Sequence, residues 1–554
     1  MATVLGLNAA FHDPSVALLV DGKIVAAAEE ERFSRRKHGK DPVPFSTWEL
    51  PQEAARWALR HAGLDARAVD AVAYAYDPDL APPTGPDVVS DEWEGLRTLF
   101  VRRAPLFVKT ALPGLDPGCV RFVPHHVAHA ASAYLFAPFE MSTVMVVDGR
   151  GERGSFLAGV SRDQRLEVLG TVSLPNSLGL MYETATSHLG FRRSSDEYKV
   201  MALAAYGEPV WADDLSRHVR VHDDGRFDTD DVDWARFTPP GRGEDGWTAG
   251  DADLAASLQH VLQETLLAIG TRLHARSGTD ALTMAGGVAL NCVANSYLFE
   301  RGPFSRMWVQ PAAGDAGTAL GAAGYVAREL GDVMEPMTTA ALGRSWQDEE
   351  LASELRRADV AFSRPADLAG SVARVIADDG VVAWVQGRSE WGPRALGHRS
   401  LLANATRTEN LARLNDIKGR EQFRPVAPMV LEERAADIFD GPIPSPFMLF
   451  THRVRPAWRA RIPAVVHVDG TARAQTVNRV EEPLVAAMLT HLERLTGCPV
   501  CVNTSLNTGG RPMVDSPVDA LECFGSSPID AMAIGPFLIR RADQTRVPRP
   551  EAAA

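Results

Sequence analysis

The hydrophobic pattern of the first 30 residues alternates apolar runs with turn signals. The run VLGLN is followed by the turn FHDPS, which contains Pro14, and then by a second run, SVALLV. Asp21-Gly22 is a strong signal for a tight hairpin turn, and the segment KIVAAAEEE follows it. The pattern therefore predicts three strands joined by a turn and a hairpin.

A similar series begins about 140 residues later. The run TVMVVD ends at Asp148 and is followed by the glycine-rich turn GRGERG, the run SFLAGV, the turn SRDQ and the run RLEVLGTVSL. Aligning Thr3 with Thr143 places Asn8 opposite Asp148. Repetition on this scale predicts two ribonuclease H-like halves, as in actin-like ATPases, whose strand–turn–strand loops hold nucleotide phosphates across a cleft. Two unrelated hairpins are the alternative.

The remaining pattern predicts further elements and one domain boundary. Residues 211–252 are rich in Asp, Gly and Pro and indicate a loop or insertion, whereas the apolar spacing that follows predicts a helix ending at Gly278. Two units of strand, glycine turn and helix come next. The pattern lapses over residues 331–350, so we expect one domain at 1–340 and an α/β domain at 345–554.

Composition and charge narrow the class of protein. The chain has 554 residues, of which 45% are hydrophobic and 23% charged, and its formal net charge is −14. This composition is typical of soluble globular proteins, and the acidic balance argues against nucleic-acid or anionic-membrane partners. No apolar run approaches the roughly 20 residues of a membrane helix, and no signal peptide opens the chain. We expect a cytoplasmic enzyme.

The cysteines do not indicate a disulfide framework or a zinc site. The chain has five of them, and only Cys498 and Cys501 form a CxxC pair. Neither a second pair nor a flanking histidine completes a metal site there. The segment GCPVCVNTS instead predicts a buried strand.

The segment PHHVAHAASAYLF carries the sharpest local signal. His125 and His129 are four residues apart, so a helix would present both imidazoles on one face, at a spacing that can share one metal ion. Asp148 ends the next strand, and Asp315 lies in the glycine turn GDAG. Two imidazoles and two carboxylates would suit iron(II), manganese or zinc. A pair of packed histidines without a ligand is the alternative.

Two further segments suggest binding of anions. The turn GGVALN, from Gly286 and Gly287 to Asn291, follows a predicted strand and could hold phosphates or a ribose, although the chain has no P-loop motif. Residues 388–424 carry eight basic and four acidic side chains within an acidic protein. Arginines beside Gly-Pro and Arg-Pro turns fit a phosphate or carboxylate pocket, whereas Arg407 and Arg413 fit a solvated helix face.

Several motifs in order resemble one family. The chain resembles the nodulation- and antibiotic-type O-carbamoyltransferases, which include cephem, tobramycin and novobiocin carbamoyltransferases. The resemblance covers nearly the whole chain, through GLNAAFHD, EEERFSRRKHG, HHVAHA, VVDGRGE, EYKVMALAAYG, GGVALN, GDAGTALGAA, GRSEWGPRALGHRS, NDIKGREQFRPVAP and CVNTSLNTGGRPMVDSP.

The resemblance implies two chemistries in one chain. A C-terminal YrdC-like domain would take carbamoyl phosphate and ATP, with Mg²⁺, and make carbamoyl-adenylate. An N-terminal actin-like domain would hold the adenylate near a metal, usually iron(II), and pass the carbamoyl group to a hydroxyl of a small natural product. A homodimer is compatible with this arrangement. Residues 211–252 are expected to shape the acceptor pocket.

The resemblance also implies roles for individual residues. His12 falls on the proposed general base, and Lys37 matches a nucleotide contact of the N-terminal domain. The implied metal ligands are His125, His129, Asp148 and Asp315. The implied contacts to carbamoyl phosphate and ATP in the C-terminal domain are Arg394, Lys418, Arg424, Arg473 and Asn503.

Three other functions remain as alternatives at this point. A sugar-type kinase of the actin-like fold would release ADP and would have no use for the arginine-rich second domain. A non-catalytic ATPase or binding module would need neither His125 nor His129. A tRNA-modifying enzyme with both folds would need a basic face, which the net charge of −14 disfavours.

Overall fold

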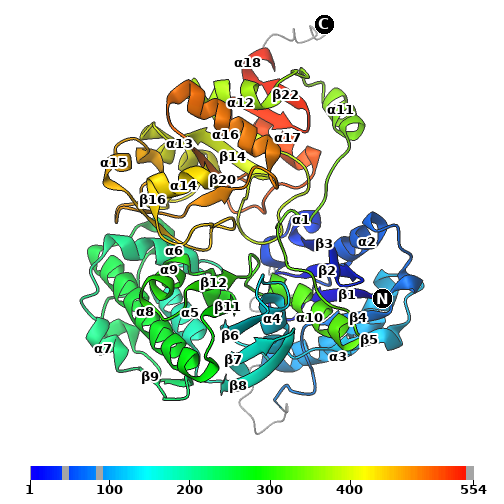
Figure 1. The fold of residues 1–554 in the computed structure, drawn as a ribbon, viewed down its shortest axis with the longest axis vertical. Coiled ribbons are helices and arrows are strands. Elements are labelled where there is room, and N and C mark those ends of the chain that lie inside the picture. The colour runs from blue at the N-terminus through cyan, green and yellow to red at the C-terminus, as the bar shows by residue number, and fades with distance from the viewer. Residues whose placement is uncertain (1, 40–48, 83–91, 545–554) are drawn as a thin grey trace, which may run out of the picture. The chain divides into compact units, whose positions relative to one another are not determined.

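The computed structural model of the chain describes residues 2–39, 49–82 and 92–544 (Figure 1). The chain consists of two compact units. The first comprises Met1–Thr338 together with the short segment Trp391–Pro393, and the second comprises Thr339–Glu390 and Arg394–Ala554.

The first unit opens with a five-stranded sheet of order β3-β2-β1-β4-β5. β1, β2 and β3 form an antiparallel meander, whereas β1, β4 and β5 run parallel. The three strands predicted over the first 30 residues are therefore confirmed. The bounds are β1 (Thr3–Asn8), β2 (Ser15–Val20), β3 (Lys23–Glu29), β4 (Ala71–Tyr74) and β5 (Val120–Phe122).

A second sheet of the same unit repeats this topology. Its order, β8-β7-β6-β11-β12, has β6 antiparallel to β7 and parallel to β11, as β1 is antiparallel to β2 and parallel to β4. The duplicated, actin-like fold class is therefore confirmed, and Asp148 follows β6 where Asn8 ends β1. The bounds are β6 (Met141–Val147), β7 (Gly154–Arg162), β8 (Arg165–Ser173), β11 (Ala281–Ala285) and β12 (Arg306–Val309).

Helix α10 (Ala316–Glu329) packs against β1 and against α4 (His125–Tyr134) at very short range. A Cβ atom on Gly6 would lie 1.8 Å from the carbonyl oxygen of Ala319, and one on Gly321 would lie 1.7 Å from that of Ala128. Only glycine allows backbones to approach this closely. The contact brings together the C-terminal end of β1, the helix α4 and the N-terminal end of α10.

The other helices of the first unit follow the predicted pattern, with one correction. α8 (Ala249–Ser277) ends at Gly278, which has a left-handed φ of 65°. Residues 211–252 are more than a loop, because they contain α7 (Ala212–Ser216) and the two-stranded sheet of β9 (Val219–Val221) and β10 (Phe227–Thr229). The remaining helices are α1 (Glu31–Ser34), α2 (Gln52–His61), α3 (Glu92–Ala111), α5 (Leu178–His188), α6 (Glu197–Leu203) and α9 (Cys292–Arg301).

The second unit is built on a mixed seven-stranded sheet of order β19-β15-β20-β14-β13-β21-β22, beside the small sheet β16-β17-β18. Val382 and Trp384 of β13 pack into a core with α12 and α16, whereas Ala383 and Val385 pack into a core on the opposite face. The sheet is therefore covered on both faces, as a YrdC-like α/β domain requires. The predicted strand at CVNTS is β20, and Cys498 and Cys501 are both buried free thiols.

The bounds of the elements of the second unit complete the description. The large-sheet strands are β13 (Val382–Val385), β14 (Arg399–Asn404), β15 (Ala427–Leu431), β19 (Gln475–Val477), β20 (Val500–Ser505), β21 (Ala531–Ile534) and β22 (Phe537–Arg540). The small-sheet strands are β16 (Phe439–Asp440), β17 (His452–Val454) and β18 (Thr471–Ala472). The helices are α11 (Asp348–Arg357), α12 (Leu368–Ala377), α13 (Glu409–Lys418), α14 (Glu432–Ile438), α15 (Pro456–Arg459), α16 (Pro483–Thr496), α17 (Pro517–Ser526) and α18 (Arg541–Gln544).

Candidate functional site

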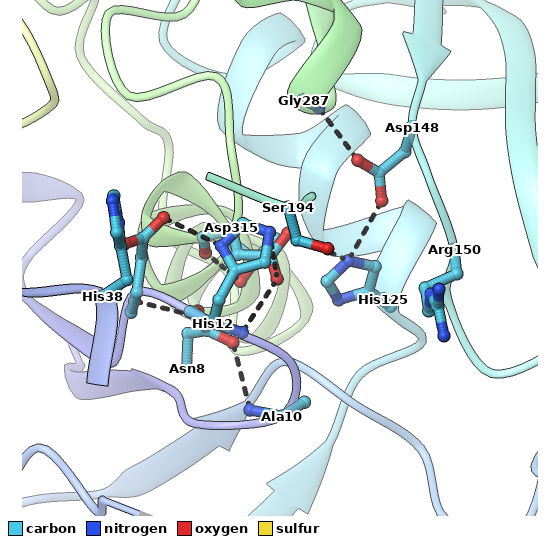
Figure 2. Close-up of polar contacts among 12 residues, drawn as sticks. Asn8, Ala10, His12, His38, His125, Asp148, Arg150, Ser194, Gly287 and Asp315 are labelled. Atoms are coloured by element: carbon cyan, nitrogen blue, oxygen red, sulfur yellow. Dashed lines mark hydrogen bonds and ion pairs between the residues drawn. The ribbon is translucent and has the colours of Figure 1, made fainter. Parts of the chain in front are cut away.

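The four predicted metal ligands lie together inside the first unit, and Figure 2 labels three of them, His125, Asp148 and Asp315. α4 begins at His125 and presents the imidazoles of His125 and His129 one turn apart. Asp148 directly follows β6, and Asp315 directly precedes α10. The ligand atoms of these four buried residues all lie within 4.8 Å of one another.

The distances among these atoms match the first coordination shell of a single cation. Nε2 of His125 lies 3.1 Å from Nε2 of His129 and 3.5 Å from Oδ2 of Asp148. Oδ1 of Asp315 lies 3.6 Å from Nε2 of each of these two histidines. Because nitrogen and oxygen ligands bind a metal such as zinc at about 2.0–2.2 Å, neighbouring donors in one shell are about 3–3.5 Å apart.

Surrounding groups aim these donors. Nδ1 of His125 lies 3.2 Å from the carbonyl oxygen of Ala75 and donates to it, which leaves Nε2 for the cation. The amide of Gly287 donates to Oδ1 of Asp148 at 2.9 Å, so that Oδ2 faces the histidines. Buried Glu152 accepts the amide of His125 at 2.9 Å. Sequence reasoning missed Glu152, whose only signal is its place in the glycine turn GRGERG.

The charges of the four side chains favour the binding of a cation. Burial alone would lower the pKa of His125, but the neighbouring carboxylates of Asp148 and Asp315 outweigh burial and raise this pKa well above its ordinary value. Burial would raise the pKa of Asp148, yet the two neighbouring histidines hold it well below its usual range. Both carboxylates are thus ionised, and a metal would displace the proton from the imidazole that binds it.

The donor set fits a divalent transition metal. Imidazole and carboxylate ligands suit iron, manganese and zinc alike, and two buried carboxylates require positive charge nearby. His126 lies between the two predicted ligands on α4, and its pKa shifts in the opposite direction from that of His125, because burial lowers it to about 3. The four predicted residues would therefore hold the metal, whereas its identity does not follow from the ligand types.

The predicted base His12 lies beside this cluster. Nε2 of His12 is 3.6 Å from Oδ2 of Asp315, and its Nδ1 is 2.8 Å from Oδ2 of Asp13. The side-chain amide of Asn8 donates to the carbonyl oxygens of His12 and Asp13 at 2.9 and 3.0 Å, which fixes the turn after β1 (Figure 2). The structure thus brings His12 and the four donors into one site.

The other predicted residues of the first unit have varied surroundings. Lys37 is half-buried and precedes His38 in a short 3₁₀ turn. The amide of Gly286 donates to Ala313, and the amide of Gly287 is already engaged by Asp148. Asn291 caps α9 by accepting the amide of Ala294, and it also pairs with Gln259. The GGVALN turn therefore holds the metal-site carboxylate and the start of α9 through these groups.

In the second unit, Oδ1 of Asn503 and Nε of Arg473 are buried and have no hydrogen-bond partner within the described part of the chain. Nδ2 of Asn503 donates to Gln475 at 2.7 Å and to the carbonyl oxygen of Ala395 at 3.1 Å. Asn503 therefore ties the loop that carries the predicted ligand Arg394 to the strand that follows Arg473. The three predicted residues belong to one neighbourhood.

Lys418 and Arg424 are held by protein groups. Nζ of buried Lys418 donates to the carbonyl oxygen and, at 2.9 Å, to the hydroxyl of Ser505, and it also donates to Oδ1 of Asn507. Arg424 pairs with Glu421 at 3.3 Å. A ligand of Lys418 would have to replace at least one of these oxygen acceptors.

Several basic side chains of residues 388–424 bond to other groups of the protein and so stabilise its fold. Arg399 is buried and donates to backbone carbonyl groups, among them those of Gln386 and Arg344. Arg388 donates in the same way to Gly343 at 3.0 Å. Arg413 pairs with Asp530, as expected for a residue on a helix face. Fewer basic side chains of residues 388–424 are therefore available to bind an anionic ligand than the net charge of this segment indicates.

Fold and site together define a class: a two-unit α/β protein whose duplicated actin-like unit contains a buried cluster of two histidines and two aspartates that could hold a metal ion. Two family models match this chain, "Carbamoyltransferase N-terminus" over residues 3–83 and 100–324, and "Carbamoyltransferase C-terminus" over residues 373–541. The chain therefore belongs to the carbamoyltransferase family, and it is an enzyme of carbamoyl transfer. The expectation of this family is confirmed.

Relatives along the whole chain agree with this assignment. Nodulation protein NolNO of Sinorhizobium fredii is 36% identical over 96% of this chain and 80% of its own length. Nodulation protein U of the same species is 31% identical over 92% of this chain and 95% of its own. An uncharacterized protein of Synechocystis is 34% identical over 98% of this chain and 97% of its own. None of the helices in the described residues is long and apolar enough to cross a bilayer.

Proposed function

We propose that this carbamoyltransferase is ATP-dependent and works through carbamoyl-adenylate. The second domain, residues 345–554, makes the adenylate from carbamoyl phosphate and ATP accompanied by Mg²⁺. The first domain, residues 1–340, transfers the carbamoyl group to a hydroxyl of a small natural product, such as an antibiotic or its sugar.

The two reactions balance with one water molecule and no redox change. Water takes the phosphoryl group of carbamoyl phosphate and leaves carbamate. A carbamate oxygen then attacks the α-phosphorus of ATP and expels pyrophosphate. Finally, the acceptor oxygen attacks the carbonyl carbon, AMP leaves, and a base takes the hydroxyl proton. Adenylation is needed because carbamate is a poor electrophile, whereas AMP is a good leaving group.

One observation carries the transfer step: Nε2 of His12 lies 3.6 Å from Oδ2 of Asp315, next to the four buried donors. A hydroxyl bound there is within reach of an imidazole, and a neutral imidazole accepts protons near physiological pH. A divalent cation such as iron(II), held by His125, His129, Asp148 and Asp315, supplies positive charge that stabilises oxygen on which negative charge develops.

Oδ1 of Asn503 and Nε of Arg473, which have no hydrogen-bond partner among the described residues, support the first reaction. A carbamoyl group offers an amide that can donate to Oδ1 of Asn503, and a phosphate or carboxylate oxygen can accept from Nε of Arg473. Arg394, Arg424 and Lys418 are the further ligands of carbamoyl phosphate and ATP. Lys37 and the segment Gly286–Asn291 are the nucleotide contacts of the first unit, and residues 211–252 shape the acceptor site.

The products test this proposal. Incubation with ATP and carbamoyl phosphate is expected to release pyrophosphate, and hydroxylamine, a strong nucleophile, should capture the adenylate as hydroxyurea with release of AMP. Release of ADP instead would favour a kinase and refute the mechanism. Measurable tRNA binding at physiological salt would favour a tRNA-modifying enzyme.

Single variants test how the work is divided. Arg473→Gln and Lys418→Ala are expected to lower the rate of pyrophosphate release by at least about tenfold, because each removes a charged hydrogen-bond donor. His12→Ala should spare pyrophosphate release and block transfer to a hydroxyl. Arg479→Gln and Lys109→Ala, at exposed positions, are the matched controls. Loss of pyrophosphate release in His12→Ala would contradict this division.

A further inference from the structure

Asp13 lies in a turn whose backbone is unusual at two positions. Its own φ is 50° and that of His38 is 60°, in the left-handed region that few side chains other than Asn and Asp enter readily. The amide of Asp13 donates to the carbonyl oxygen of His38 at 3.2 Å, although 25 positions separate the two residues. Such backbone outliers are commonly retained where side chains must be aimed.

The carboxylate of Asp13 contacts two imidazoles, one with each oxygen. Oδ2 lies 2.8 Å from Nδ1 of His12, and Oδ1 lies 2.6 Å from Nδ1 of His38. Burial would raise the pKa of Asp13, but its contacts with His38 and His12 hold that pKa well below its usual value. An ionised carboxylate can only accept hydrogen bonds, so both Nδ1 atoms must donate.

We propose that Asp13 is a positioning residue that sets the tautomer of two histidines at once: by accepting Nδ1–H from His12 and from His38, it leaves Nε2 of each neutral ring without a proton. The role of His12 as the base rests on the function proposed above. The tautomers themselves do not depend on it.

The opposite edges of the two rings have different surroundings. Nε2 of His12 faces Oδ2 of Asp315 at 3.6 Å, which is longer than a hydrogen bond. Nε2 of His38 is buried and has no hydrogen-bond partner within the described part of the chain. Each Nε2 is therefore an acceptor, that of His12 for an acceptor hydroxyl and that of His38 for a donor group of a bound ligand.

The backbone does not need the Asp13 carboxylate for its shape. Asn8 holds the carbonyl oxygens of His12 and Asp13, and Oε2 of Glu31 accepts the amide of His38 at 3.0 Å. The turn is therefore fixed by other groups. Replacement of Asp13 by Asn, which tolerates positive φ, should change the tautomers while it leaves the fold in place.

The test is ¹⁵N NMR of histidine side chains in the full chain, labelled at histidine and loaded with diamagnetic zinc(II). His12→Gln and His38→Gln assign the two rings. In the wild type, both rings should carry the proton on Nδ1. In Asp13→Asn, the amide offers one oxygen acceptor and one NH₂ donor, so at least one ring should move its proton to Nε2. Asp21→Asn, at an exposed turn aspartate that also has a positive φ (53°), is the matched control and should change neither ring.

Each outcome decides the proposal. An Nε2–H tautomer of either ring in the wild type overturns it, and so does an Asp13→Asn variant that keeps Nδ1–H on both rings. Hydroxyurea formation from ATP, carbamoyl phosphate and hydroxylamine tests the proposed function separately. If the wild type forms none, the adenylate mechanism fails while the NMR result still decides the role of Asp13.

Discussion

Glu30 offers a test of the fold, because the structure predicts both the sign and the size of its effect on how the free energy of unfolding changes with pH. Its side chain is 2% exposed and caps helix α2 from a distance, because its carboxylate accepts the amides of Ala54 at 2.8 Å and Glu53 at 3.1 Å. Pro51, the residue before the helix, supplies no side-chain cap. Burial raises the pKa of Glu30 from 4.5 to about 7, although the two amides act in the opposite direction.

The direction in which stability changes with pH follows from which state of the chain, folded or unfolded, binds the Glu30 proton more tightly. Because the pKa of Glu30 is higher in the folded chain than in the unfolded chain, its stabilising contribution is full below about pH 4.5 and is lost as the pH rises to about 7. The gap between 4.5 and about 7 corresponds to about 3 kcal/mol, at about 1.4 kcal/mol for each tenfold change in proton affinity. This is a large part of the stability of an ordinary domain.

The variant Glu30→Gln keeps an oxygen acceptor for the cap and removes the titration. The free energy of unfolding of the variant, relative to that of the wild type, should rise by about 3 kcal/mol between pH 4 and pH 8. Urea unfolding at a series of pH values measures this difference. Glu29 is also buried with a pKa of about 7, but it is present in both proteins and cancels.

Glu53→Gln is the matched control, because this side chain lies in the first turn of the same helix and is 45% exposed. Its stability relative to the wild type should change little across the same pH range. If the curves of Glu30→Gln and wild type ran parallel from pH 4 to pH 8, Glu30 would not be a buried ionisable cap and the reasoning would be wrong.

Two further predictions concern metal and thiols. The double variant His125→Ala, His129→Ala should bind iron(II) or zinc(II) more than about 100-fold more weakly than the wild type by equilibrium dialysis, whereas the exposed control His222→Ala should bind normally; unchanged binding in the double variant would refute the site. Cys498 and Cys501 should react slowly with a disulfide reagent at pH 8 in the folded chain, because burial raises the pKa of Cys501 to about 12 and also raises that of Cys498. Fast reaction of either thiol, in peptides mapped by mass spectrometry, would show a redox-active pair.

Local patterns were sufficient to predict the duplicated sheets and to select four residues that the structure brings together, His125, His129, Asp148 and Asp315. The ligands stand at positions with sequence signals: a helical i, i+4 spacing for His125 and His129, a strand end for Asp148 and a glycine turn for Asp315. The hairpin β9–β10 was missed because its strands have three residues each. Strands this short leave almost no alternation to detect.

Local sequence patterns could not predict contacts between segments that are far apart in the chain. The pairing of Asp13 with His38 spans 25 positions, and the amide of Gly287 meets Asp148 across 139 positions. The arginines of residues 388–424 pose the same problem, because a local sequence cannot show that Arg399 is buried and donates to the backbone carbonyl groups of Gln386 and Arg344. Which arginine binds a ligand depends on the surrounding carbonyl groups, and these are set by the tertiary fold.

The duplication also explains why the site is asymmetric. β1 and β6 are equivalent strands, and their ends carry Asn8 and Asp148 at corresponding positions. An amide can donate hydrogen bonds, so Asn8 fixes the turn that carries His12 and Asp13. A carboxylate can only accept them, so Asp148 takes the amide of Gly287 with one oxygen and faces the histidines of α4 with the other. One exchange of amide for carboxylate therefore distinguishes a strand end that positions the His12 imidazole from a strand end that contributes a candidate ligand for a cation, and Asp315 lies within 3.6 Å of both His12 and His125.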